Sequence, residues 1–175
     1  MDLAIRLASR ADEIPLRRLV FKYLQETYNQ GGDFPATLEN AAVFTELAIQ
    51  GAEEYDPCLV VTDAGKLVGF AMARGTDIPG TTTRQRTVRT WGTYLRPDYR
   101  RLELGFAMWL VIGRVARQAG YTRFMAFQFN HEYGILAGKS LARIASLKKA
   151  GDIYLWDFGA PPRAVVSEAA EGINA

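Results

Sequence analysis

The sequence RPDYRRLELGFAMWL, residues 96–110, carries the pattern that decides the fold of this chain. Pro97 ends a β-rich segment, and two adjacent arginines, Arg100 and Arg101, precede a strongly apolar stretch with helical spacing. Gly105 lies near the start of that helix. The first N–H groups of a helix attract anionic oxygens, so a strand, a basic turn and a helix suit a phosphate-binding loop. The alternative is that this segment only opens a core helix.

Composition indicates a single soluble domain without a metal centre. The chain has 175 residues, of which 49% are apolar and 23% charged, with a net charge of +2. That length can bury a sizeable core, and the charge is too small to indicate nucleic acid as a partner. One cysteine, Cys58, and one histidine, His131, exclude an intrachain disulfide, a cysteine zinc site and a histidine-rich metal site. We find no secretion signal and no membrane-length apolar run, and therefore expect a cytoplasmic protein.

The first part of the chain predicts a strand and two helices. Weak alternation predicts a strand over Leu3–Leu7. A helix then begins near Pro15, with Asp12 as its cap, and ends at a pair of glycines. A second helix runs from the cap Thr37 to about Gln50.

The remaining part changes between the strand period and the helix period. Two apolar runs around Asp63 and Gly65 predict a β-hairpin. The segments that follow are a long strand ending near Leu95, a helix over 103–119, a strand over 121–130, a short helix over 140–150 and a final strand over 152–158.

The order of elements, β-α-α-β-β-β-α-β-α-β, predicts an α/β fold. A strand–helix–strand unit beside hairpin strands gives a mixed, mostly antiparallel sheet flanked by helices on both faces. We expect residues 1–158 to form one domain. Residues 159–175 are rich in small side chains, and we expect an extended tail that could dock onto an assembly partner or a second copy of the chain.

Both this order and the opening segment resemble the GNAT superfamily of N-acetyltransferases, over about residues 5–158. The acetyl-CoA motif of that superfamily runs V-x-P-x-x-R-x-x-G-x-G/A after the fourth strand. Pro97, Arg100 and Gly105 match it, whereas Glu103 stands where the first glycine is usual. The resemblance implies a divergent member with the GNAT fold and with acetyl-CoA as co-substrate.

The resemblance also implies which residues bind coenzyme A. Amides at the start of the helix would hold its pyrophosphate, and the backbone N–H of Leu95 would face the thioester carbonyl. Glu103 keeps its N–H but adds a negative charge that satisfies the helix dipole and competes with phosphate. The implied cofactor-binding set is Leu95, Arg100, Arg101, Leu102, Glu103, Leu104, Gly105 and Phe106.

The groups that would move protons are harder to find. The fourth strand carries no carboxylate or histidine, so a general base would come from Asp77, His131 or Glu132. His131 has the pKa closest to neutrality of these types. Many superfamily members carry a tyrosine on the last helix as general acid, but Leu147 occupies that position here. Tyr133 is the remaining candidate acid.

Two further sets of side chains allow either a structural or a functional interpretation. Trp91 and Tyr94 could line a cleft for the acceptor substrate, although such aromatics more often fill a sheet face. Arg84, Arg86 and Arg89 could contact phosphates of a nucleic acid, although arginines also protect a strand edge from pairing.

The leading hypothesis is therefore acyl transfer from acetyl-CoA to a primary amine of a small molecule or protein, by direct attack in a ternary complex. One alternative is a catalytically silent relative that serves as a binding or structural component of a larger assembly. A second alternative is a relative that modifies nucleic acid. Fold alone does not choose the acceptor.

Overall fold

The computed structural model describes residues 2–28, 35–53, 56–76, 87–127, 147–150 and 153–157. Within these ranges the chain forms seven strands, three α-helices and two short 3-10 helices. In chain order the elements are β1 (Leu3–Leu7), η1 (Arg10–Asp12), α1 (Glu13–Tyr28), α2 (Leu38–Glu53), β2 (Cys58–Asp63), β3 (Lys66–Thr76), β4 (Thr87–Leu95), η2 (Pro97–Tyr99), α3 (Leu102–Gln118), β5 (Arg123–Phe127), β6 (Leu147–Ala150) and β7 (Ile153–Asp157).

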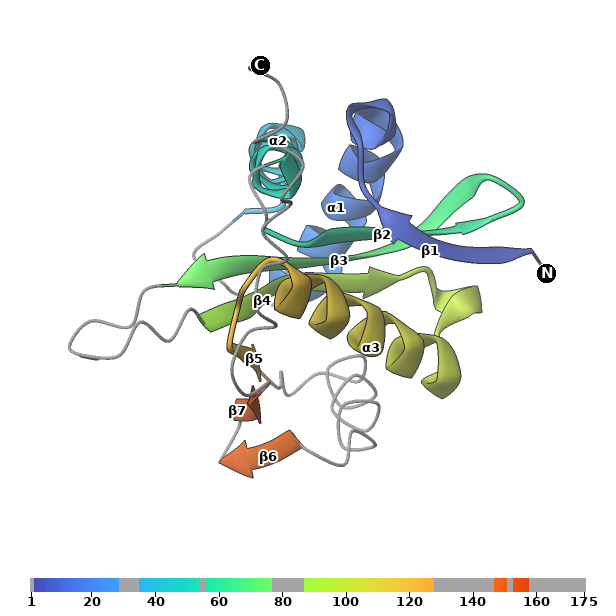
Figure 1. Ribbon diagram of the computed structural model, residues 1–175. Coiled ribbons are helices and arrows are strands. Elements are labelled where there is room, and N and C mark those ends of the chain that lie inside the picture. Colours follow the sequence, from blue (N-terminus) through green and yellow to red (C-terminus); the bar gives the residue numbers. More distant parts are fainter. Residues whose placement is uncertain are drawn as a thin grey trace, which may run out of the picture.

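All of these strands join one sheet in the order β1-β2-β3-β4-β5-β7-β6. The pairing of β4 with β5 is parallel, and the other described pairs are antiparallel. Helices α1 and α2 cover one face of the sheet, and α3 crosses the other face as it connects β4 to β5 (Figure 1). The predicted fold class, a mixed sheet flanked by helices on both faces, is confirmed.

Each face of the sheet has its own hydrophobic core. On one face Met108 and Ile112 of α3 are buried against the sheet, as their helical spacing predicts. On the other face Leu16 and Val20 of α1 are fully buried, together with Ile49 of α2. Burial of such side chains contributes about 1.5–3 kcal/mol each, so these two cores fix the helices on the sheet.

Turn and cap chemistry set the ends of several elements. The β2–β3 hairpin turns at Ala64 and Gly65, both with positive φ (47° and 77°), as a two-residue loop with matching twist requires. The Oγ1 of Thr37 accepts the Asn40 N–H at 3.0 Å and caps α2 as predicted. None of the helices in the described ranges has the length and apolar character that a bilayer span needs.

The start of α1 differs from the expectation that Asp12 is a simple helix cap. Asp12 lies in η1, the 3-10 turn whose N-cap is Ser9, and it accepts the Ser9 N–H at 2.9 Å. The Arg6 guanidinium also donates to both oxygens of the Asp12 carboxylate, at 2.6 and 2.7 Å. This hydrogen-bonded pairing with Arg6 holds the pKa of Asp12 below its usual value.

The prediction of a short helix over 140–150 is wrong for its last four residues. Residues 147–150 form strand β6, which pairs antiparallel with β7 over Leu147–Trp156 to Ala150–Ile153. The backbone groups of β7 need partners on the side away from β5, and this hairpin supplies them. Residues 140–146 lie outside the described residues. The signal was present in the sequence: only Gly151 and Asp152 separate the two strands, a pair typical of hairpins.

Candidate active site

The candidate site lies where β4 separates from one of its two neighbours. β4 pairs with β3 over eight residue pairs, from Thr87 to Leu95. Among the described residues it pairs with β5 over three, and the last of these joins Arg89 to Met125. Beyond Arg89 the sheet therefore opens between β4 and β5, directly before the turn that leads into α3 (Figure 1).

A β-bulge bends β4 at this opening. Met72 of β3 lies opposite Gly92 and Ala73 lies opposite Thr90, so Trp91 is an extra residue on β4. A bulge leaves its extra residue without a partner on the adjacent strand and increases the local twist. Its position, two residues after the last β4–β5 pair, accounts for the divergence of the two strands.

The register shows which backbone groups of β4 point into the opening. The Arg96 N–H donates to the Val68 carbonyl at 2.9 Å, so the pair formed by Gly69 and Leu95 is not itself hydrogen-bonded. The N–H and C=O of Leu95 therefore point away from β3, toward the side where β5 has separated. The same alternation turns the N–H of Thr93 to that side. Thr93 is a residue that the sequence analysis missed.

The first turn of α3 borders the same opening. The Arg101 N–H donates to the Tyr99 carbonyl at 2.8 Å, and the Gly105 N–H donates to the Arg101 carbonyl at 3.0 Å. Among the amides from 101 to 106, those at 102–104 are the ones that a helix directs along its axis. The Glu103 side chain in this turn is exposed, as is that of Arg101, while Leu104 and Phe106 are half-buried on the core of α3.

Arg100 points away from the helix start. Its Nε donates to the Leu95 carbonyl at 2.8 Å, and its guanidinium forms an ion pair with Glu26 near the end of α1. It also lies over the Tyr94 ring, 5.3 Å from the centroid, in cation–π contact. Arg100 thus ties the β4–α3 turn to α1, a contact between residues 74 positions apart that local sequence does not signal.

Tyr94 and Trp91 are both packed on the α1–α2 face. Tyr94 is almost fully buried and donates its hydroxyl hydrogen to Glu26 at 2.9 Å. Burial, together with this hydrogen bond, raises the pKa of Tyr94 to about 12. Trp91 is half-buried and stacks on Phe44 of α2, with the ring centroids 4.6 Å apart. Of the two, Trp91 is the one that a bound molecule could reach.

Other reactive groups give little support for covalent or metal chemistry in the described ranges. Burial raises the pKa of the Cys58 thiol to about 12, so it is not a nucleophile at neutral pH. No group of three or more potential ligands (His, Cys, Asp or Glu) is assembled among the residues that the structure describes. His131, Tyr133, Asp77, Glu132 and the arginines at 84 and 86 lie outside these residues.

Comparison with solved structures shows the same fold in several acetyltransferases. The PaiA N-acetyltransferase of Thermoplasma acidophilum, solved with coenzyme A, is 15% identical with a TM-score of 0.60, covering 90% of this chain and 99% of its own. yncA of Salmonella typhimurium, solved with acetyl-CoA, is 19% identical with a TM-score of 0.65 over 94% and 99% of the two chains. An N-acetyltransferase of Staphylococcus aureus Mu50 is 17% identical with a TM-score of 0.67 over 90% and 99%.

Comparison of the sequence gives the family. A search of curated proteins finds no match. The family model described as "Acetyltransferase (GNAT) family" matches residues 18–133, which is more than half of the chain and spans α1 to the segment after β5. The match includes the opened strand β4 and the helix start that follows it. This chain belongs to the GNAT family of acetyltransferases.

Proposed function

We propose that this protein transfers an acyl group, most simply acetyl, from acetyl-CoA to a primary amine by direct attack in a ternary complex. The observation that carries the proposal is the opening between β4 and β5. There the strand's outward amides and the first turn of α3 lie next to each other. Structures of two similar proteins contain coenzyme A or acetyl-CoA, which supports this ligand.

The residues present fit such a ligand through their backbone. The amides at 102–104 would bind the pyrophosphate, because N–H groups at a helix start carry partial positive charge. Arg101, whose side chain is exposed, would add charge from the rim. Arg100 would act indirectly, by holding the turn against α1. Gly105 would let the backbone approach closely, and the half-buried Leu104 and Phe106 would anchor the helix on its core.

Acetyl-CoA would supply an activated acyl group, and the chain would orient and polarise it. The Leu95 N–H would donate to the carbonyl oxygen as negative charge develops there, a contribution that needs no particular side chain. Thr93, with the same backbone orientation, would hold the ligand along the strand. Trp91 would border the amine acceptor, with Tyr94 behind it. His131 would take the proton that the attacking amine loses, and Tyr133 would give a proton to the thiolate that leaves when the C–S bond breaks.

A second candidate function is a GNAT-family protein that no longer acetylates and serves as a binding component. The specific observation in its favour is Glu103, an acidic side chain in the first turn of α3 where pyrophosphate would bind. The absence of a tyrosine at Leu147, which lies in a strand, also favours it.

Calorimetric titration with acetyl-CoA and with coenzyme A separates the two candidates. It is applied to the wild type, to Glu103→Gly and to Glu103→Gln, which removes the charge but keeps the side-chain size. Micromolar binding by the wild type, followed by turnover in a screen of amines, supports the transferase. Binding only after Glu103 is replaced favours the silent component, and the absence of binding in all three proteins contradicts both the ligand and the reaction.

A further inference from the structure

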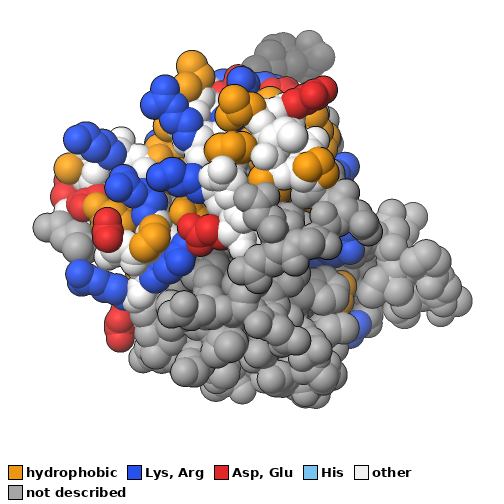
Figure 2. All heavy atoms as spheres, turned by 180° about the vertical axis from the view of Figure 1, so that it is seen from behind, with side chains coloured by type: hydrophobic (Ala, Val, Ile, Leu, Met, Phe, Trp, Pro, Cys, Tyr) orange, Lys and Arg blue, Asp and Glu red, His pale blue; other side chains and the backbone are white. Residues whose placement is uncertain are grey.

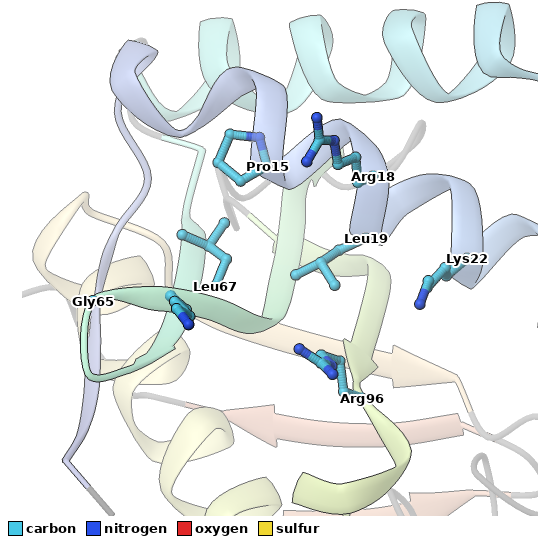
Figure 3. A pocket seen from close by; sticks show the side chains of 8 residues that line it. Pro15, Arg18, Leu19, Lys22, Gly65, Leu67 and Arg96 are labelled. Carbon is cyan, nitrogen blue, oxygen red and sulfur yellow. The ribbon is translucent and has the colours of Figure 1, made fainter.

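A basic pocket lies on the α1 side of the sheet, beside the β2–β3 turn and the residue that follows β4. Its volume is about 410 Å³. Arg18 and Lys22 come from α1, and Arg96 lies across from them after the end of β4, with Leu19 between. Leu67 lies to one side, near Pro15 and Gly65 (Figure 3). The remaining lining residues are Pro15, Gly65 and Lys66.

The charge in this pocket has one sign. Four of the eight lining residues are Lys or Arg, and none is acidic. Within the described part of the chain, neither hydrogen bonds nor ion pairs join the side chains of these four to a carboxylate. Seen from behind, Lys and Arg side chains, with Asp and Glu side chains among them, gather on the side of the molecule that holds the N-terminus and the β2–β3 turn in Figure 1 (Figure 2).

Arg18 and Lys22 are exposed on α1, but their spacing differs from the pairing of opposite charges that is usual on a solvated helix face. Arg17, one position earlier, is paired with Glu13 in the usual i,i+4 manner at 2.5 Å. Arg18 and Lys22 are also four residues apart, but both are positive, and such like-charge pairs destabilise a helix. A bound anion would relieve this repulsion.

The pocket is built on fixed elements. Leu19 is buried in the core between α1 and the sheet, so the backbone that carries Arg18 is held in place. Arg96 is fixed by its backbone N–H, which donates to Val68 of β3. Sites on packed helices and strands hold their geometry better than sites on loops.

We infer that this pocket is a second ligand site, for a small phosphorylated molecule distinct from coenzyme A. Guanidinium groups bind phosphate through two parallel hydrogen bonds and lysines bind it as point charges, so two of each suit a dianion. The apolar floor formed by Pro15, Leu19 and Leu67 would contact the carbon part of the molecule. The volume exceeds what inorganic phosphate fills and lies in the range of small-molecule sites.

The test is calorimetric titration of the full chain with phenyl phosphate and with inorganic phosphate. The pocket variant is Arg18→Gln/Lys22→Gln, and the matched control is Arg114→Gln/Arg117→Gln, which removes the same charge from the exposed face of α3. We expect tighter binding of phenyl phosphate than of phosphate, at least about tenfold weaker binding in the pocket variant, and no change in the control. Lys66→Gln, a change at the exposed first position of β3, replaces the double variant if that variant does not fold.

Three results would overturn the inference: no binding by the wild type, equal loss in the pocket and control variants, or displacement of phenyl phosphate by saturating coenzyme A. The last result would assign the pocket to the coenzyme A site. The proposed acetyl transfer is tested separately, because a wild type that ignores coenzyme A can still bind phenyl phosphate.

Discussion

The two edges of β4 are built differently although the same nine residues form both. Toward β3 the pairing continues from Thr87 to Leu95, whereas toward β5 it stops at Arg89. The edge toward β3, which is paired at every residue except Trp91, supplies stability, and the open edge carries the backbone groups of the proposed ligand site. The proposed site would therefore be made mostly by strand geometry, which is less sensitive to side-chain replacement than a cluster of catalytic residues. A fold that depends on strand geometry in this way agrees with the structural similarity to three acetyltransferases at only 15–19% sequence identity.

The largest effect should come from exchanging a residue for proline, either in the paired ladder of β3 or on the open edge of β4. Ala71 and Thr93 lie opposite each other, but the Ala71 N–H belongs to the ladder with β2 and the Thr93 N–H points into the opening. Ala71→Pro should lower the free energy of unfolding by about 3 kcal/mol or more. Thr93→Pro should lower it by about 1–2 kcal/mol and should weaken the binding of acetyl-CoA at least about tenfold. Urea denaturation and calorimetry measure both. Equal destabilisation by the two prolines would contradict the difference between the paired ladder at Ala71 and the open edge at Thr93.

A methyl group at the paired edge should have the next largest effect. A Cβ on Gly69 would lie 2.4 Å from Cδ2 of Leu95 and 2.8 Å from the Tyr94 carbonyl oxygen, so the two strands would have to separate. Gly69→Ala should lower the free energy of unfolding by about 2 kcal/mol. Gly92→Ala is the control, because the atoms nearest to its Cβ would belong to Tyr23, the first at 3.3 Å, and it should cost less than about 1 kcal/mol. The reverse order in urea denaturation would contradict this account.

The end of α1 that lies far from the opening should respond to pH. Arg6 holds the pKa of Asp12 down, so its contribution is present above the unfolded pKa of about 3.9 and is lost as the pH falls through the lower folded pKa. Asp12→Asn should cost about 1–2 kcal/mol at pH 7, and the difference from wild type should shrink toward pH 3. Denaturant titrations at both pH values check it. A difference that does not change with pH would assign the effect to packing.

The smallest effect concerns the contact between the open edge and α1. Glu26→Gln removes the charge partner of Arg100, while the Nε bond to the Leu95 carbonyl remains. Both side chains are partly exposed, so stability should change by less than about 1 kcal/mol. Loss of one negative charge close to the open edge should tighten coenzyme A binding by about threefold, measured by calorimetry. Glu39→Gln, at an exposed position of α2, controls for net charge. A similar gain in coenzyme A affinity there would assign the effect to overall charge.

The parts of the fold with a clear period were predictable. Leu3–Leu7 is a strand within the predicted bounds, and the helix predicted over 103–119 differs from α3 by one residue at each end. The error at 147–150 arose because a short segment fits either period, and the partner strand decided it. Residues that share one face of a strand or helix leave a periodic pattern in the sequence, which explains why β1 and α3 were predicted correctly.

The candidate site was predictable only in part. The turn before α3 follows from its motif, and the placement of Leu95 on an open edge agrees with its proposed role. The bulge at Trp91 and the contact of Arg100 with Glu26 were not predictable, because both depend on which segments meet across the fold. The basic pocket was missed for the same reason, since its residues come from three separate elements.

The extra residue at Trp91 also changes how the rest of β4 is oriented. In an unbroken strand, residues an odd number of positions apart face opposite sides. Val88 and Leu95 are seven positions apart, yet both lie in the core under α3, while Tyr94 lies under α1. After the bulge, the side chains of β4 therefore alternate in the opposite phase: positions that would face one core face the other. Deletion of one residue here would turn Leu95 and Tyr94 to the wrong cores, so an alignment or design that omits the bulge would misassign every position that follows it.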